Sequence, residues 1–508
     1  MKKLLKTLTS RMFIVILLLV LQFAAIAVIA LRFSSRFVLI SIIAEAISLL
    51  LVVHILRGWA NPGFKIAWIL VVLVFPAFGA LMFLLLGNRN IGRKAREKMI
   101  ALTSRTVKLF FRRSTAMPYM EVADEDGAAQ SRYLEDYGGY PVYRATGSKY
   151  YPSGEDMFPD FLTDLSHAKR FIFMEYFIIN KGEMWDQVLG VLKERAAAGV
   201  DVRLIYDDFG CLSYLPVHYA AELEKAGIHT HVFNPVFPTL DSGMNNRDHR
   251  KICVIDGNVG YTGGINLADE YINKKRRFGY WKDTAVRLHG DGVWSLTIMF
   301  LTMWSFLTGK NSNFEDYRPS EREMDAIGYV QPFADAPVDR ENVAENAYLN
   351  MISRARRYVY ITTPYLVLDN EMRTALCNAA KSGLDIRIFT PAIPDKKTVF
   401  QVTRQNYEPL LNAGVKIYEF TPGFVHAKSF VADDKYAIVG TINLDYRSLY
   451  LNFENGVFLC GTESVTTIRD DLLDMQKKSR QMTLEASRSG SLIRRFVIDL
   501  ISVFSPMM

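Results

Sequence analysis

Three long apolar runs near the N-terminus are the clearest feature of the hydrophobic pattern. The runs cover residues 12–31, 37–56 and 66–86. The first contains no charged residue, the second includes Glu45, and the third contains Pro76. About 20 apolar residues are enough to cross a bilayer as a helix. Apolar residues occupy all sides of these helices, which argues against a soluble bundle. We therefore expect transmembrane segments within residues 1–88, and a secretory signal peptide is the alternative for the first run.

Both flanks of this apolar region are basic. Lys2, Lys3, Lys6 and Arg11 precede it, and basic residues crowd the stretch 89–113 that follows it. Positive flanks favour the cytoplasmic side of a membrane at each end. Two cytoplasmic ends require an even number of crossings, whereas three runs are present. Either one run is re-entrant or interfacial, or the charge rule fails here.

Strands and helices alternate through the rest of the chain, after a mixed polar connector that ends near residue 150. The first predicted elements are a strand at 171–179, a helix at 184–198, a strand at 200–206, a helix at 219–226 and strands at 228–233 and 249–255. Such alternation predicts a mainly parallel sheet with helices on both faces.

The same order of elements then recurs, which indicates an internal repeat. The sequence AGVDVRL at 198–204 matches SGLDIRI at 382–388, and the second copy begins with a strand at 357–364. We place the first unit at 151–325, the second at 326–485, the basic region and connector at 89–150, and an amphipathic tail at 486–508. A repeat of this length predicts two copies of one fold unit.

Each unit carries one H-x-K-x4-D motif followed by G-x-x-N. The motif residues are His249, Lys251, Asp256 and Asn266 in the first unit, and His426, Lys428, Asp433 and Asn443 in the second. On a strand, a histidine and a lysine two residues apart share a face. The imidazole and the ammonium could then point at one anionic group such as a phosphate. The alternative is a duplicated fold in which both histidines are hydrogen-bonded core residues with a structural role.

A carboxylate stands at the same aligned point in both units, Asp283 in the first and Glu454 in the second. A nucleophilic imidazole needs an acceptor at its other nitrogen. We expect the partner of each histidine to be the carboxylate downstream of it, about thirty residues further along the chain. The motif aspartates Asp256 and Asp433 lie at predicted turns, and we interpret them as organising the motif more than reacting.

Two histidines and two lysines suit the chemistry of a phosphodiester. One histidine attacks phosphorus, the other protonates the leaving oxygen, and the lysines neutralise the phosphate charge. No metal and no cofactor are required. The four cysteines form no C-x-x-C pair, which is typical of core residues and not of a zinc site. The net charge of +7 permits nucleic-acid binding, but the apolar runs favour a membrane surface.

The paired motifs resemble those of the phospholipase D superfamily. The run GTINLDYRS at 440–448, the sequence NFEN at 452–455 and the sequence NPGFKIAW at 61–68 are similar to the long form found in bacterial cardiolipin synthases. The resemblance implies two pseudo-symmetric α-β-α units that form one catalytic domain behind N-terminal transmembrane helices. It also implies a multi-pass protein of the bacterial plasma membrane.

The activity implied by the resemblance is a phosphatidyl transfer. One phosphatidylglycerol would be attacked by His249, with His426 as general acid and base, and a second phosphatidylglycerol would resolve the phosphatidyl-histidine to cardiolipin. The reverse assignment of the histidines stays open. A hydrolase of the same superfamily and a non-catalytic membrane scaffold are the alternatives to the transferase.

Three further segments are candidates for contact with anionic lipids. They are the apolar loop at 235–238, the basic and aromatic stretch at 274–281, and the tail at 491–504, whose pattern is typical of an interfacial amphipathic helix. The alternative for the first segment is a loop packed on its own domain. For the second it is a solvated loop, and for the tail it is a helix packed on the domain.

Overall fold

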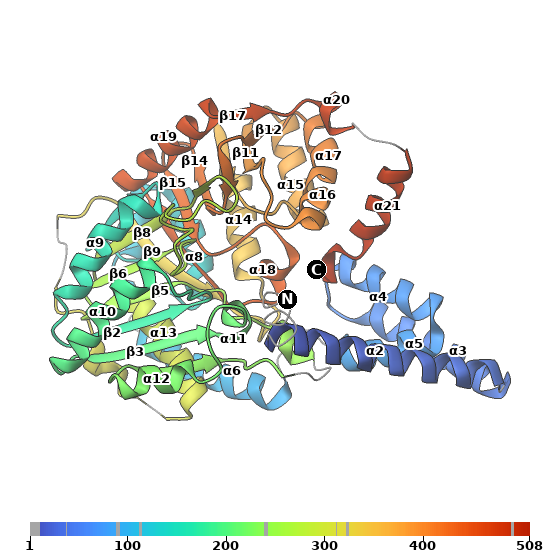
Figure 1. Cartoon of the computed structure of the whole chain (residues 1–508). Coiled ribbons are helices and arrows are strands. Elements are labelled where there is room, and N and C mark those ends of the chain that lie inside the picture. Colours follow the sequence, from blue (N-terminus) through green and yellow to red (C-terminus); the bar gives the residue numbers. More distant parts are fainter. Residues whose placement is uncertain are drawn as a thin grey trace.

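The structure is a computed structural model of the full chain, and it describes residues 11–36, 38–87, 92–110, 114–237, 242–310, 312–321, 325–488 and 492–507. Two α/β units lie side by side, and a group of N-terminal helices projects from one side of them (Figure 1). The predicted basic residues Lys2, Lys3 and Lys6, and parts of the basic stretch and of the loop at 235–238, fall outside the described residues.

The first unit is built on a seven-stranded sheet of order β1-β8-β6-β5-β2-β3-β4. Its strands are β1 (Thr146–Tyr151), β2 (Phe171–Tyr176), β3 (Asp201–Asp207), β4 (His229–Phe233), β5 (Ile252–Ile255), β6 (Val259–Gly263) and β8 (Ala285–Gly290). Only the β2–β3 and β3–β4 pairs are parallel. The remaining pairs of this sheet are antiparallel.

The second unit repeats this arrangement on an eight-stranded sheet of order β17-β12-β11-β10-β14-β15-β16-β9. Its strands are β9 (Tyr329–Asp335), β10 (Tyr358–Thr362), β11 (Asp385–Pro391), β12 (Lys416–Phe420), β14 (Ser429–Ala432), β15 (Tyr436–Gly440), β16 (Glu454–Cys460) and β17 (Ser479–Gln481). Again only two pairs are parallel, β10–β11 and β11–β12.

The prediction of mainly parallel sheets is therefore wrong. The helix-connected strands β2, β3 and β4 are parallel as expected, but each motif strand is followed by a hairpin. Asp256 and Gly257 in the first unit, and Asp433 and Asp434 in the second, have positive φ and turn the chain directly back. A hairpin turn makes its two strands antiparallel.

Helices cover both faces of each sheet, which confirms the predicted α-β-α layering. In the first unit they are α9 (Gly154–Ser166), α10 (Glu183–Ala197), α11 (Asp208–Cys211), α12 (Tyr219–Lys225) and α13 (Val293–Thr308). In the second they are α14 (Val343–Arg354), α15 (Asn370–Lys381), α16 (Lys397–Gln405), α17 (Tyr407–Asn412), α18 (Tyr446–Tyr450) and α19 (Glu463–Lys477). Every residue of β2 is buried, because this strand lies under helices on both sides.

The predicted polar connector contains two helices. It forms α7 (Met117–Ala123) and α8 (Glu125–Asp136), and β1 begins before the predicted boundary at 151. Ala128 and Leu134 of α8 are buried against the second unit. The basic stretch before it forms α6 (Arg93–Val107), in which Met99 is buried in the core of the two units.

The first two apolar runs form single helices, α2 (Arg11–Arg36) and α3 (Val38–Arg57). The third run is divided into α4 (Pro62–Val74) and α5 (Pro76–Leu86). A Cβ atom on Gly79 would lie 2.2 Å from the carbonyl oxygen of Val71, so α5 folds back closely against α4. Thirteen helical residues span only about 20 Å, less than the hydrocarbon core. The third run is thus a short helical hairpin.

Within the described residues, no helix meets the length and apolarity needed to cross a membrane. The multi-pass arrangement stays a prediction.

The start of α4 is joined to the second unit by a polar contact network. The side-chain amide of Asn61 donates to the Tyr450 hydroxyl at 2.9 Å and to Glu371 at 3.2 Å. Tyr450 also donates to Glu345 at 3.0 Å and to Asp369. The N-terminal helices are therefore fixed to the unit that carries the second motif.

Candidate active site

His249 lies just before β5 and not on it, so the predicted strand at 249–255 begins too early. The segment that carries it pairs across the two units instead. The backbone N–H of His249 donates to the carbonyl of Phe453 at 3.0 Å, and that of Phe453 donates to the carbonyl of Arg247 at 2.8 Å. The first motif is thus hydrogen-bonded to the segment that leads into Glu454.

The second motif is held in the same way by the first unit. Strand β13 (Gly423–Val425) pairs in parallel with β7 (Tyr280–Lys282), and these two short strands form a sheet of their own. The backbone N–H of His426 then donates to the carbonyl of Lys282 at 2.7 Å, one residue before Asp283.

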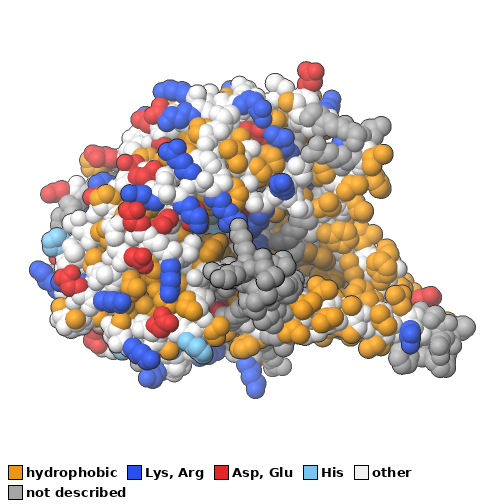
Figure 2. Space-filling model, in the orientation of Figure 1, with side chains coloured by type: hydrophobic (Ala, Val, Ile, Leu, Met, Phe, Trp, Pro, Cys, Tyr) orange, Lys and Arg blue, Asp and Glu red, His pale blue; other side chains and the backbone are white. Residues whose placement is uncertain are grey.

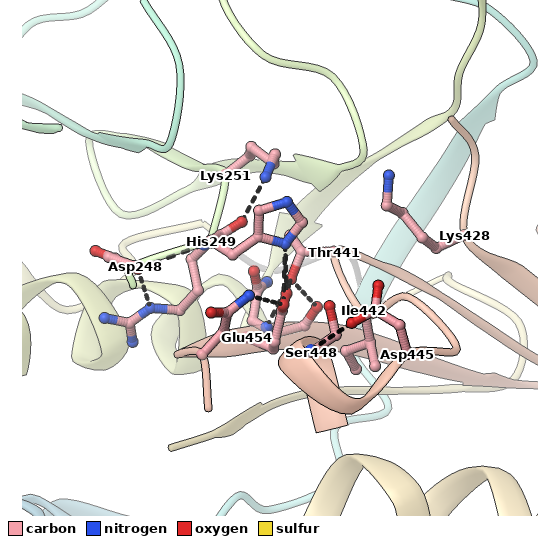
Figure 3. Close-up of polar contacts among 12 residues, drawn as sticks. Asp248, His249, Lys251, Lys428, Thr441, Ile442, Asp445, Ser448 and Glu454 are labelled. Carbon is pink, nitrogen blue, oxygen red and sulfur yellow. Dashed lines mark hydrogen bonds and ion pairs between the residues drawn. The ribbon is translucent and has the colours of Figure 1, made fainter. Parts of the chain in front are cut away.

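As a result, the histidine–carboxylate pairs are exchanged between the units. The Nδ1 atom of His249 lies 2.9 Å from both carboxylate oxygens of Glu454 (Figure 3). The Nδ1 atom of His426 lies 2.7 Å from Oδ2 of Asp283. Both predicted carboxylates lie beside a motif histidine, but each belongs to the other unit, so the expected pairing with the carboxylate downstream in the same unit is wrong.

Burial controls the protonation of these pairs. Both histidines are 8% exposed, and Glu454 and Asp283 are fully buried. Burial, partly opposed by Glu454, lowers the pKa of His249 to about 4. Burial and the Lys428 charge, opposed by Asp283, lower the pKa of His426 to about 3. Burial alone would raise the pKa values of the Asp283 and Glu454 carboxyls, but the neighbouring histidines and lysines hold these pKa values below normal. Neutral imidazoles therefore face ionised carboxylates, with Nδ1–H donating and Nε2 left as the nucleophilic nitrogen.

The two lysines lie on either side of the His249 imidazole (Figure 3). Each ammonium donates to the carbonyl of its motif histidine, Lys251 to His249 at 2.5 Å and Lys428 to His426. Burial lowers the pKa of Lys251 to about 7 and that of Lys428 to about 8, against the pull of Glu454 and Asp283. Lys428 also lowers the pKa of His249, so the charge of the second motif acts on the histidine of the first.

The motif asparagines have unequal surroundings. Asn266 accepts a hydrogen bond from the N–H of Ile178 at 3.0 Å and donates to the Tyr271 hydroxyl at 2.7 Å. These bonds use Asn266 to support the wall of the site. The side chain of Asn443 is buried, and its Oδ1 atom has no hydrogen-bond partner among the described residues.

The motif aspartates lie at the other end of β5 and β14, in the turns. The Asp256 carboxylate accepts from the backbone N–H groups of Lys169, Arg170 and Phe171 at 2.7–2.9 Å. The Asp433 carboxylate accepts in the same way from residues 356–358. This geometry agrees with the organising role expected from the sequence: each aspartate fastens a hairpin turn to the start of the neighbouring central strand.

Several residues that shape the site were not singled out from the sequence. The Thr441 hydroxyl and the Asn452 amide donate to Glu454. Gly264, at the position aligned with Thr441, leaves room for Asp283, because a Cβ there would lie 2.0 Å from Oδ1 of Asp283. The sequence signal for Gly264 and Thr441 is weak: each lies inside the repeated G-x-x-N, directly after the aligned glycine.

Aromatic rings line both histidines. Phe177 stands edge-on to His249 at 5.1 Å between ring centroids, and Tyr271 and Trp281 lie 5.5 and 5.4 Å from His426. Trp281 ends the stretch at 274–281, so this part of the predicted lipid-binding loop forms the wall of the site. Lys274 and Lys275 pair with Glu183 and Glu270.

Comparisons with known proteins agree with this geometry. Residues 161–278 and 348–475 match the family "Cardiolipin synthase, PLD-like domain", and residues 46–88 match the family "Phospholipase D-nuclease N-terminal". The two PLD-like segments each contain one H-x-K-x4-D motif.

Similar proteins cover most of the chain. An uncharacterized protein of Streptococcus mutans is 44% identical over 87% of this chain and 96% of its own length. A cardiolipin synthase of a Geobacillus strain is 36% identical over 88% of this chain and 89% of its own, and cardiolipin synthase 2 of Bacillus cereus is 35% identical over 88% and 87%.

Among solved structures, the phosphatidylserine synthase of Haemophilus influenzae covers 74% of this chain and 97% of its own, with a TM-score of 0.55 and 14% identity, and so shares the fold. Taken together, the duplicated motif, the shared fold and the extent of these matches show that the chain belongs to the cardiolipin synthase family of the phospholipase D superfamily.

Proposed function

We propose that the protein is a phosphatidyltransferase that condenses two phosphatidylglycerol molecules into cardiolipin and glycerol. The observation that carries this proposal is the pair of exchanged histidine–carboxylate contacts, with two buried lysines beside them. Relatives named cardiolipin synthase support the choice of substrate.

In the first step, Nε2 of His249 attacks the phosphorus of one phosphatidylglycerol. The P–O bond to glycerol breaks, and His426 gives the leaving oxygen its proton. The bound phosphodiester brings a negative charge next to His426, which raises the pKa of this imidazole and favours the protonated form needed for this step. Lys251 and Lys428 stabilise the charge on the phosphoryl oxygens.

In the second step, His426 takes the proton from the terminal hydroxyl of a second phosphatidylglycerol. The alkoxide oxygen attacks phosphorus, the P–N bond to His249 breaks, and cardiolipin is released. Each proton and bond lost in the first step is restored in the second, so the enzyme returns to its starting state. Lys251, Lys428 and the exchanged carboxylates serve both steps.

We also propose that the protein works at the bacterial plasma membrane, where its substrate resides. The exposed apolar side chains of α2 to α5 support this placement, since large exposed apolar surfaces mark membrane or protein contacts.

The test is product analysis with purified full-length protein and phosphatidylglycerol labelled both in the acyl chains and in the glycerol headgroup. Cardiolipin and free glycerol in equal amounts are expected. Phosphatidic acid as the sole lipid product would replace the transferase with a hydrolase, and the absence of any turnover would favour a scaffold. The double variant His249→Ala/His426→Ala, which lacks both motif histidines, is the negative control.

A further inference from the structure

The C-terminal helix α21 (Leu492–Val503) has an apolar stripe that the rest of the protein leaves uncovered. Ile493, Phe496, Val497 and Leu500 are 79%, 69%, 47% and 54% exposed. Their spacing of i, i+3, i+4 and i+7 places all four on one side of the helix. Single exposed apolar residues are ordinary, but an ordered stripe of four needs an explanation.

The opposite side of α21 is fixed to the second unit by polar contacts. Gln405 of α16 donates to Asp499, and Arg495 lies 3.4 Å from Glu408 of α17. Glu408 also binds Arg488, just before α21, at 2.9 Å. These contacts set the rotation of the helix, so the apolar stripe points away from the catalytic units.

The end of the chain holds α21 beside α4. The short helix η4 (Ser505–Met507) follows α21, and its Pro506 is buried. A Cβ atom on Gly63 would lie 3.0 Å from Cγ of Pro506, so the C-terminal residues pack directly on the first turn of α4. Ile501 of α21 packs on the same apolar cluster as Phe64 of α4. The C-terminal residues therefore meet α4 of the N-terminal helices.

Consequently, the stripe on α21 continues the apolar surface of the N-terminal helices. On α4, the outward side chains Ile66, Leu70, Leu73 and Val74 are exposed. Figure 2 shows apolar side chains running along one side of the molecule from α21 over α4 toward α2, whereas charged side chains are scattered over the catalytic units.

We infer that α21 lies in the interface of the lipid bilayer, with Ile493, Phe496, Val497 and Leu500 inserted among the lipids and its polar side bound to α16 and α17. This inference rests on the proposed function, because a lipid-modifying enzyme works at a membrane. Two separate elements, α21 and the α4–α5 hairpin, would then orient the second unit on the bilayer. An amphipathic helix with charged residues on one side and large apolar residues on the other is suited to this position.

Depth measurements on the full-length protein in vesicles test the inference. Cys377 is the partly exposed native cysteine and is first replaced by serine, while the other three are buried. A spin label is then placed at Phe496→Cys, or at the exposed position Lys477→Cys on α19 as the control. In phosphatidylglycerol–phosphatidylcholine vesicles, we expect the label at 496 to collide more with oxygen than with a polar nickel complex, and the label at 477 to do the reverse. Equal access of the nickel complex to both labels would overturn the inference, and so would dipolar broadening showing that 496 contacts a second copy.

A second pair of variants gives a functional measure. Phe496→Asp should lower the rate of turnover on vesicles by about tenfold, because burial of one aromatic side chain is lost. On monodisperse short-chain lipid its rate should equal that of the wild type. Lys477→Asp should be neutral in both assays. An equal loss on both substrates would mean that Phe496 supports the fold and not the membrane contact.

The two proposals fail in distinguishable ways. The spin-label result does not require turnover, so a lipid-exposed label on a protein that makes no cardiolipin would remove the proposed activity alone. A water-exposed label on an active enzyme would remove only the placement of α21.

Discussion

His249 in the first unit hydrogen-bonds through Nδ1 to Glu454 in the second, at 2.9 Å to each carboxylate oxygen. The reciprocal contact joins His426 to Asp283 at 2.7 Å. Backbone pairing of β7 with β13, and of Asp248 with Phe453, holds both contacts in register. Neither unit therefore contains a complete histidine–carboxylate pair, and the site exists only where the two units meet.

This exchange predicts which variants share a defect. If His249 is the nucleophile, Glu454→Gln should act like His249→Ala and prevent formation of the phosphatidyl-enzyme. Asp283→Asn should act like His426→Ala, which slows both steps but keeps the nucleophile, so labelled lipid can still form on the protein. By analogy with other carboxylate–histidine pairs, each amide variant should lose roughly 10³-fold or more in turnover.

Quenched samples separated on denaturing gels would measure the trapped lipid. The assignment fails if Glu454→Gln accumulates labelled protein together with His426→Ala, since that result would pair each histidine with its own unit. If instead His249→Ala and Glu454→Gln carry labelled lipid whereas His426→Ala and Asp283→Asn carry none, the pairing stands and His426 is the nucleophile.

The pH dependence should be set by the lysines. The pKa is about 7 for Lys251 and about 8 for Lys428, lowered mainly by burial. A lysine is charged below its pKa, so kcat/KM should fall as the pH rises from 7 to 8 and the free enzyme loses the charges that bind phosphate. The histidines, with pKa values of about 4 and 3, are already neutral and should add no inflection near 6.5.

Initial rates on vesicles between pH 5 and 9, at fixed ionic strength, would check this profile. Lys428→Arg should remove the part of the fall near pH 8 and leave the part near pH 7 that Lys251 sets, because a guanidinium stays charged throughout this range. A profile that rises through pH 6.5 would show a histidine that must lose a proton in the free enzyme.

The sequence predicted the chemistry better than the arrangement of the units. The repeated motifs identified His249, His426, both lysines and both carboxylates, because each of these residue types is needed for phosphodiester chemistry. The alignment could not show that Asp283 faces His426, since two equivalent positions look the same whether the units act separately or exchange partners. The antiparallel pairing of β5 with β6 was missed because helix–strand alternation was extended through a hairpin turn.

The motif aspartates should contribute stability and not turnover. Asp256 accepts three backbone hydrogen bonds in a turn with positive φ, at the end of β5 that is remote from His249. Asp256→Asn removes the charge from these bonds, which should lower the free energy of unfolding by about 1–3 kcal/mol. The kcat of the folded fraction should stay within about twofold of the wild type.

Thermal unfolding in parallel with active-site titration by phosphatidyl-enzyme burst would separate the two effects. Lys169→Ala is a matched control, because it removes a side chain at the same turn and leaves its backbone N–H in place. A large loss of kcat in fully folded Asp256→Asn would show that this aspartate takes part in turnover.

Gly264 should be as important for catalysis as the carboxylate it makes room for. A Cβ at this position would lie 2.0 Å from Oδ1 and 2.9 Å from Cγ of Asp283, so Gly264→Ala must displace the carboxylate from His426. We expect the turnover of Gly264→Ala to fall to the level of Asp283→Asn, with the same amount of labelled lipid on the enzyme. Gly190→Ala on α10 is the control, since a Cβ there meets no atom within 4 Å and alanine favours a helix. Combining Gly264→Ala with Asp283→Asn should add little further loss, because both changes break the same contact. Multiplied losses in the double variant would show that Gly264 acts on another part of the site.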